Sequence, residues 1–140
     1  MRHFPLIPRL KRLYTIKWIA EKMTWHARAS SCMEFSRHPR DSAEWVNSNI
    51  MWRDFAKDPR NIRLAIATDG FSPNNMFGRK YSCCPVIIQP LNPPPSMCMK
   101  SEFSMLSVLI PGPKSPSSNI DVFLQPLVDE LKILWSGVEA

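Results

Sequence analysis

The chain has 140 residues, of which 44% are hydrophobic and 21% are charged, and its formal net charge is +6 at pH 7. This length suits one domain with a sizeable buried core, and the composition excludes both a disordered chain and a membrane-like one. No apolar run approaches the ~20 residues that cross a membrane, and prolines and bases interrupt the start, MRHFPLIPRLKR, where a secretory signal needs an unbroken apolar region.

We therefore expect an intracellular protein whose cysteines are reduced. The candidate zinc ligands are four cysteines and three histidines: Cys32, Cys83, Cys84, Cys98, His3, His26 and His38. They form no CxxC pair and show no ligand spacing, so no zinc site is expected. Adjacent cysteines on a strand point to opposite faces, and at least one of Cys83 and Cys84 is better explained as a small apolar core residue.

The excess positive charge lies in the first part of the chain. Residues 1–60 contain 12 Lys or Arg against 6 Asp or Glu, whereas residues 61–140 contain 6 of each kind. This division separates a basic helical segment, 1–60, from a second part, 61–140. The positive charge of the first segment indicates an anionic partner, with nucleic acid as the first candidate. The alternative is that the basic helix face is simply solvated.

Helical periodicity dominates the first segment. Leu6, Leu10 and Leu13 are spaced by four and three residues, which predicts a helix with one apolar face after Pro8. Three basic residues fall largely outside this stripe and are the candidate contacts to nucleic acid: Arg9, Lys11 and Arg12. A second helix is predicted from Thr15, a candidate N-cap, to about Ala29.

A further helical stretch follows a connector at residues 30–41. Asp41-Ser42 is typical of a helix start, and Pro59 predicts an end near Asp58 because proline keeps the preceding residue out of the α region. Three aromatic residues repeat at helical spacings beside other apolar residues, and we expect them in the core rather than stacked on bases: Trp45, Trp52 and Phe55.

Three strands and a final helix are predicted in residues 61–140. The strands are an apolar run at 62–68, a second run at 81–91 and an alternating run at 102–110. Pro85 and Pro90 imply short pairing, an edge or a bulge in the second strand. Short connections favour antiparallel pairing. The helix IDVFLQPLVDELKILW follows Asn119, a candidate N-cap, and Gly137 is expected to end it.

Asp69 directly follows the first strand, and two interpretations are open. Asp-Gly after a strand is ordinary turn chemistry, because Gly accepts positive φ and Asp bonds its own backbone. A strand end is also the usual place for a scaffold to present a carboxylate to solvent. Three strands and a helix, with Asp on the first strand, resemble the opening of a ribonuclease H-like fold. We therefore expect a mixed α+β or α/β fold with an incomplete sheet.

Eight stretches resemble the catalytic-region transposase of plant CACTA-type DNA transposons, in order and with ordinary spacing: HFPLIPRLKRLY, AEKMTWHA, RHPRDSAEW, DFAKDPRNIRLAIATDGFSP, YSCCPVI, MCMK, PGPKSP and IDVFLQPLVDELKILW. The resemblance implies a nuclear DDE transposase, which cuts and joins DNA with two divalent ions, Mg²⁺ or Mn²⁺, held by three carboxylates. Asp69 matches the first of these carboxylates. The resemblance thus implies that Asp69 is a catalytic residue and a metal ligand.

The same resemblance implies an incomplete site. In the family the second Asp lies on the strand after the final helix, and the Glu comes much later. Four acidic residues near the end match no catalytic position: Asp121, Asp129, Glu130 and Glu139. We expect a fragment that does not catalyse transposition alone. The alternatives are a small basic nucleic-acid-binding or interaction protein derived from a transposon, or a non-functional remnant.

The missing strand has a physical consequence. The backbone of residues 62–68 is expected to expose unpaired donors and acceptors, which favours aggregation or self-association through this edge. The final helix is expected to lose part of its packing surface, so that Leu127, Leu131 and Leu134 are only partly buried.

Overall fold

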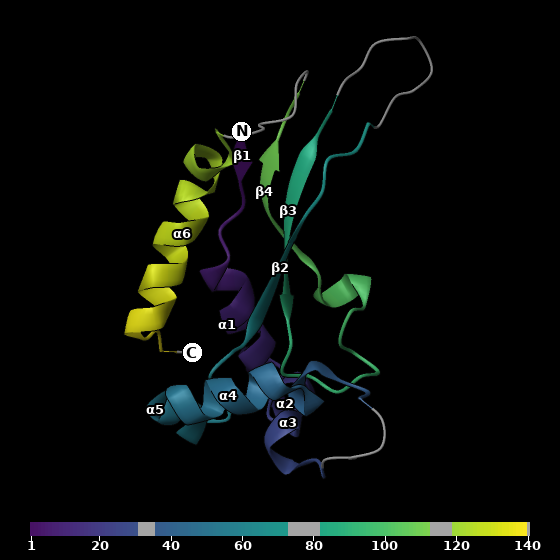
Figure 1. Ribbon diagram of the computed structural model, residues 1–140, viewed down its shortest axis with the longest axis vertical. Helices are drawn as coiled ribbons and strands as arrows, with labels where there is room; N and C mark the ends of the chain where they lie inside the picture. Colours follow the sequence, from purple (N-terminus) through teal and green to yellow (C-terminus); the bar gives the residue numbers. More distant parts are fainter. Residues whose placement is uncertain (31–35, 73–81, 113–118, 140) are drawn as a thin grey trace. The chain divides into compact units, whose positions relative to one another are not determined.

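The structure is a computed structural model that describes residues 1–30, 36–72, 82–112 and 119–139. Its elements are β1 (Arg2–His3), α1 (Ile7–Thr15), α2 (Lys17–Met23), α3 (Trp25–Arg28), η1 (Pro39–Asp41), α4 (Ala43–Met51), α5 (Arg53–Lys57), β2 (Leu64–Thr68), β3 (Cys84–Pro90), η2 (Ser101–Phe103), β4 (Met105–Ile110) and α6 (Ile120–Ser136) (Figure 1). The expected mixture of N-terminal helices, antiparallel strands and a final helix is confirmed. Parts of the expected connections at 30–41, 70–80 and 111–118, and also Cys32, lie outside the described residues.

The antiparallel sheet has four strands in the order β1-β4-β3-β2, where the sequence predicts three. The additional strand is β1, in which Arg2 and His3 pair with Leu109 and Val108 of β4. A two-residue strand is too short to show an alternating pattern, so only its partner reveals it. β3 pairs antiparallel with β4, and the register shifts between Val86 and Ile87. This irregularity follows Pro85, where a bulge was one of the expected outcomes.

β2 is the last strand of the sheet order, so no further strand covers its outer edge among the described residues. The expected edge position of this strand is confirmed. Ile66 at its centre is exposed, and the strand LAIAT contains neither Lys nor Pro, two residues that commonly protect strand edges.

The described residues belong to two compact units. The sheet unit comprises Met1–Arg12, Ile66–Ile88 and Met105–Ala140, and the helical unit comprises Leu13–Ala65 and Gln89–Ser104. In the part of the chain that the structure describes, no helix is both long and apolar enough to cross a membrane.

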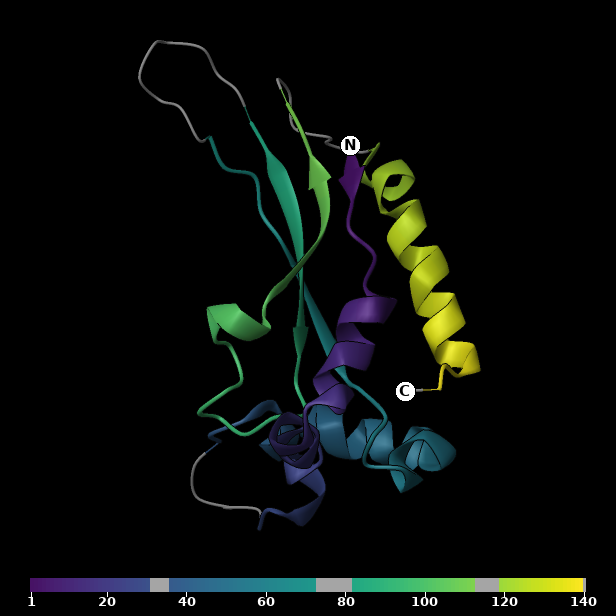
Figure 2. The ribbon, with the colours of Figure 1, turned by 180° about the vertical axis from the view of Figure 1, so that it is seen from behind.

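In the sheet unit, α6 contacts β4 and lies beside β1 in both views (Figures 1 and 2). Its core consists mainly of aliphatic side chains: Leu6, Leu10, Val86, Ile88, Val108, Ile110 and Leu127. Leu127 is only 2% exposed, so the expectation of partial burial is wrong for this residue. The reason is that α6 packs against β4, which covers this side chain even without a further strand. Leu131 and Leu134 are half-buried, as expected. Gly137, with φ of 102°, ends α6 as predicted.

In the helical unit, the single helix predicted from Thr15 to Ala29 is divided into α2 and α3. Thr15 is the last residue of α1, and Ile16 occupies the N-cap position of α2, which corrects the prediction. Thr24 separates α2 from α3, and its hydroxyl donates to the Glu21 carbonyl at 3.1 Å, a local bond that competes with helix continuation. The helix start after Ser42 and the helix end near Asp58 are as predicted. The Ser42 oxygen accepts from the Trp45 N–H at 3.3 Å, and α5 ends at Lys57.

The expected aromatic core is only partly present. Trp45 is buried and Phe55 is half-buried, but Trp52 is 49% exposed. α4 ends before Trp52, whose φ of −117° and ψ of 63° are not helical. The helical spacing therefore does not continue through this position, and the predicted burial of Trp52 is wrong.

The uncovered edge of β2 generates a prediction about self-association. Replacing Ile66 by Lys places a charge at the centre of the strand and opposes pairing with another chain. We expect light scattering to give a lower mean mass for Ile66→Lys than for the unmodified chain at equal concentration. Val122→Lys, the equivalent change at an exposed position of α6, should leave the mass unchanged. Equal effects of both changes would show that the β2 edge is not the contact.

Candidate functional site

Asp69 directly follows β2 in the sheet unit and is exposed to solvent. Two residues later, Phe71 forms an antiparallel bridge with Cys83, with N···O distances of 2.9 and 2.8 Å. Between them, a Cβ added at Gly70 would lie 3.4 Å from the Cys84 Sγ. The carboxylate is thus presented from a backbone that the sheet holds on both sides.

A metal centre at Asp69 would need further ligands close to its carboxylate. Among the described residues, no three His, Cys, Asp or Glu side chains lie close enough together to hold a metal ion. Two divalent ions ~4 Å apart require several oxygen ligands. The described residues therefore do not fit a two-metal centre on their own.

The three described cysteines are buried thiols: Cys83, Cys84 and Cys98. Burial raises the pKa of Cys98, which keeps that thiol protonated and weakens it as a nucleophile or metal ligand.

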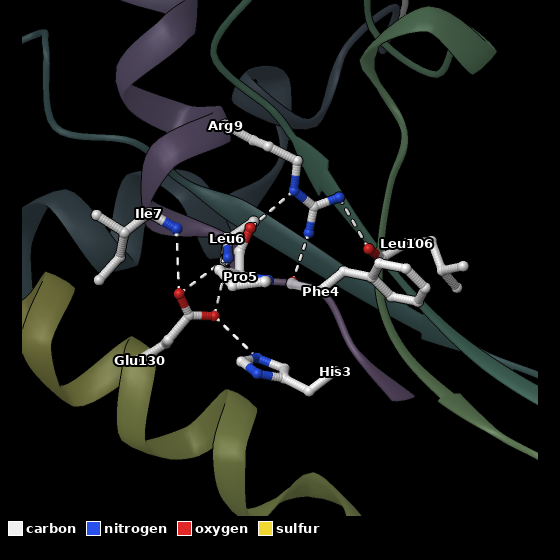
Figure 3. Close-up of polar contacts among 8 residues, drawn as sticks. All are labelled: His3, Phe4, Pro5, Leu6, Ile7, Arg9, Leu106 and Glu130. Carbon is white, nitrogen blue, oxygen red and sulfur yellow. Dashed lines mark hydrogen bonds and ion pairs between the residues drawn. The ribbon is translucent and has the colours of Figure 1, made fainter. Parts of the chain in front are cut away.

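Of the basic residues predicted to contact nucleic acid, Arg9 has a clear role inside the sheet unit (Figure 3). Its Nε donates to the Pro5 carbonyl at 2.8 Å, its Nη1 to Leu106 at 2.8 Å and its Nη2 to Phe4 at 2.7 Å. Partial burial lowers the pKa of Arg9, and the nearby Glu130 carboxylate opposes this shift. The guanidinium thus joins the segment before α1 to β4.

Lys11 and Arg12, in contrast, are exposed on α1. Both side chains are accessible to a large anionic partner at the surface of the chain.

Glu130 on α6 is a structurally important residue that the sequence did not identify. Its Oε1 and Oε2 each accept from the Leu6 N–H at 2.9 Å, and Oε1 also accepts from the Ile7 N–H at 3.2 Å. Its Oε2 lies 3.0 Å from His3 Nε2 (Figure 3). The carboxylate therefore caps the N-terminus of α1, where N–H groups lack partners inside the helix and the dipole favours negative charge.

The helical unit contains a buried group of polar side chains around Trp45. His26 is 8% exposed and His38 is 4% exposed. Both rings meet the Trp45 indole edge-on, with centroid distances of 5.5 and 6.2 Å. The Arg63 guanidinium lies 4.2 Å from the centroid of the same indole and 5.2 Å from that of Phe55. This arrangement is a cation–π cluster with two histidines beside it.

Asn92 ties this cluster to the segment before β2. Its Oδ1 accepts from the Arg63 N–H at 2.7 Å, and its Nδ2 donates to the Asn61 carbonyl at 2.9 Å. The Arg63 carbonyl in turn accepts from the Leu91 N–H at 2.8 Å. Asn92 is fully buried, so its amide replaces water for these backbone groups.

Burial lowers both histidine pKa values. The charge of Arg63 lowers the pKa of His26 further, whereas the Pro93 backbone and the Asp41 carboxylate partly oppose the lowering at His38. The two rings are therefore neutral at pH 7 in the folded chain.

Residues 34–140 match the family described as "Transposase family tnp2" in a comparison with known protein families. The matched residues include Asp69, β2, β3, β4 and α6, but not Arg9, Lys11 or Arg12. No curated protein and no solved structure matches the chain.

The capping of α1 by Glu130 predicts that this carboxylate stabilises the folded chain. Glu130→Gln removes the charge at the N-terminus of α1 but keeps one acceptor oxygen. We expect the free energy of unfolding, measured by urea denaturation, to fall by about 1 kcal/mol. Glu139→Gln, the same change at an exposed residue, should have no effect. Equal stability of Glu130→Gln and the unmodified chain would contradict the capping role.

The two buried histidines, His26 and His38, lead to a prediction about the pH dependence of stability. A histidine with a lowered folded pKa binds fewer protons than its unfolded form, whose pKa is near the ordinary 6.5. Stability is therefore fully present above this value and is lost as the pH falls below it. We expect a lower urea midpoint at acidic than at neutral pH, and a smaller difference in His26→Gln and His38→Gln. An unchanged difference in both variants would exclude these histidines as the cause.

Proposed function

Because the chain belongs to the transposase family tnp2, we propose that it is part of a CACTA-type DDE transposase and carries the first metal-ligating carboxylate, Asp69. The observation that supports this role is the position of Asp69, exposed directly after a strand and within the matched residues. The proposal includes a ribonuclease H-like catalytic domain, action on transposon DNA in the nucleus, and Mg²⁺ or Mn²⁺ as the metal. An aspartate oxygen is a ligand that both ions accept.

The chain by itself does not carry out strand cleavage in this proposal. Metal-dependent phosphoryl chemistry needs further carboxylates beside Asp69, and the described residues hold no group of three such ligands. The contribution of this chain is a solvent-facing carboxylate on a sheet-supported backbone. Additional ligands would have to come from outside the described residues.

Electrostatic binding to DNA is the second candidate function, and it does not require catalysis. Residues 1–60 carry all of the excess positive charge. Lys11 and Arg12 are exposed, and Arg9 is half-buried, with its guanidinium bonded to three backbone carbonyls. We therefore propose that Lys11 and Arg12 contact phosphates directly, and that Arg9 acts by stabilising the segment that precedes α1.

The metal-ligand proposal is tested by Mn²⁺ and by DNA cleavage. We expect dilute Mn²⁺ to broaden the NMR amide signals next to Asp69, and expect Asp69→Asn to abolish this broadening. Asp54→Asn, the same change at an exposed residue of the helical unit, should retain it. With Mg²⁺ or Mn²⁺ the chain should not nick plasmid DNA. Nicking that Asp69→Asn removes would show that the chain holds a complete site.

The DNA-binding proposal predicts a particular salt dependence. The double variant Lys11→Gln/Arg12→Gln should reduce the slope of log Kobs against log salt by about 2, because each phosphate contact to a duplex contributes roughly 0.9. Lys100→Gln/Lys132→Gln removes the same charge from exposed residues of the second part of the chain and should change the slope little. Anisotropy titrations with a labelled duplex measure both slopes. Equal losses in the two variants would show that net charge alone determines binding.

A further inference from the structure

The final helix, α6, uses only part of its circumference to pack on the sheet unit. It contacts β4 and buries Leu127, and in both views no other described element of this unit covers the side of α6 away from β1 (Figures 1 and 2). Several large apolar side chains of the helix are therefore exposed to solvent: Val122, Val128, Ile133 and Trp135. Exposed apolar side chains that gather on one face commonly mark a contact with another protein.

One row of apolar residues runs along α6 beside its buried side, and we call it the α6 stripe. Its members are separated by four, three and four positions, which is the repeat with which two helices pack against each other: Leu124, Val128, Leu131 and Trp135. The first and third are half-buried, whereas Val128 is 38% exposed and Trp135 is 62% exposed. Val122 and Ile133 point to the other side of the helix and lie outside this stripe.

Charges beside the α6 stripe favour a second copy of the same helix as its partner. Asp121 lies in the first turn of α6 and Lys132 in its second half, and both residues are exposed. Within the chain, Lys132 makes only a long contact of 4.0 Å with Asp129. An antiparallel pair of α6 helices brings the negative end of each stripe to the positive end of the other. A parallel pair would place like charges together.

The spacing of these residues fits an antiparallel pair whose twofold axis passes Val128, the midpoint of α6. Val128 then faces its own copy. Because a helix rises about 1.5 Å per residue, Leu124 lies at nearly the same height as the partner's Leu131. By the same rise, Lys132 lies about 4.5 Å along the axis from the partner's Asp121, which a lysine side chain can span. The twofold axis makes each of these contacts occur twice.

We propose that the α6 stripe is the contact between two copies of this chain, which pair through α6 in the antiparallel orientation. Removal of the apolar stripe from water drives the association, and the two ion pairs between Asp121 and Lys132 select the orientation. This contact is separate from pairing through the β2 edge. The inference goes beyond the proposed function, because it depends neither on Asp69 nor on DNA binding.

Sedimentation equilibrium of the Ile66→Lys chain tests the proposal, because this background opposes pairing through the β2 edge. We expect a monomer–dimer equilibrium. Adding Val128→Lys places two like charges against each other at the twofold axis and should weaken dimerisation roughly tenfold. Val122→Lys is the matched control, since it makes the same change on the same helix but outside the stripe. It should leave the dissociation constant unchanged, although Val122 is more exposed, at 74%.

Charge reversal in the same background tests the orientation of the two helices. Asp121→Lys alone and Lys132→Asp alone should each weaken the dimer about threefold, because each change puts like charges into both contacts. The double variant Asp121→Lys/Lys132→Asp should restore the original dissociation constant. Restored affinity excludes misfolding as the cause of the losses in the single variants.

The opposite results would overturn the proposal. A chain that stays monomeric at the highest soluble concentration would do so in favour of a different protein as the partner of the α6 stripe. A dimer that Val128→Lys leaves intact, or that Val122→Lys weakens equally, would place the contact elsewhere. Single charge variants that the double variant does not rescue would exclude the antiparallel pair. None of these results involves Asp69 or DNA, so each would leave the proposed function intact.

Discussion

The Glu130 carboxylate connects three segments of the sheet unit that are distant in sequence. It accepts hydrogen bonds from the backbone at the start of α1, contacts His3 of β1 and belongs to α6. Without it, the first N–H groups of α1 would lose their acceptor and the side of α6 that faces β1 would lose its polar contact (Figure 3). Arg9 adds a second connection, because its guanidinium reaches the Leu106 carbonyl of β4. The packing of Leu6 and Leu127 in the core takes place within this frame.

The helical unit uses uncharged and cationic groups for a similar purpose. Asn92 and Arg63 connect the loop after β3 to the segment before β2, and Arg63 also stacks on Trp45. Because the two neighbouring histidines are neutral, the cluster contains no repulsion between them and Arg63 at pH 7. Protonation of either histidine would place a second positive charge near Arg63 inside the unit and destabilise the cluster.

Catalysis and DNA binding make different demands on this chain. A metal-dependent reaction needs several carboxylates in one place, whereas the described residues contain no group of three candidate ligands. DNA binding needs positive charge at the surface, and exposed basic side chains such as Lys11 carry such charge. The function that we propose therefore assigns one carboxylate, Asp69, to the catalytic site and surface charge to DNA affinity.

The sequence by itself determined the features that depend on neighbouring residues: the helix around Leu10, although it begins at Ile7 rather than after Pro8, the helix after Ser42, the strand before Asp69, the irregular pairing near Pro85 and the helix end at Gly137. Its family resemblance also agrees with the match over residues 34–140, while the role of Asp69 stays a prediction. Tertiary structure alone decided which distant groups meet. β1 exists because β4 offers it an edge, and Glu130 caps a helix that begins more than 120 positions earlier. Trp52 is exposed because the α4 helix ends before it, and Arg9 serves the fold because Leu106 lies within its reach. Local patterns specify backbone conformation, but they contain no information on partners that only chain folding brings together.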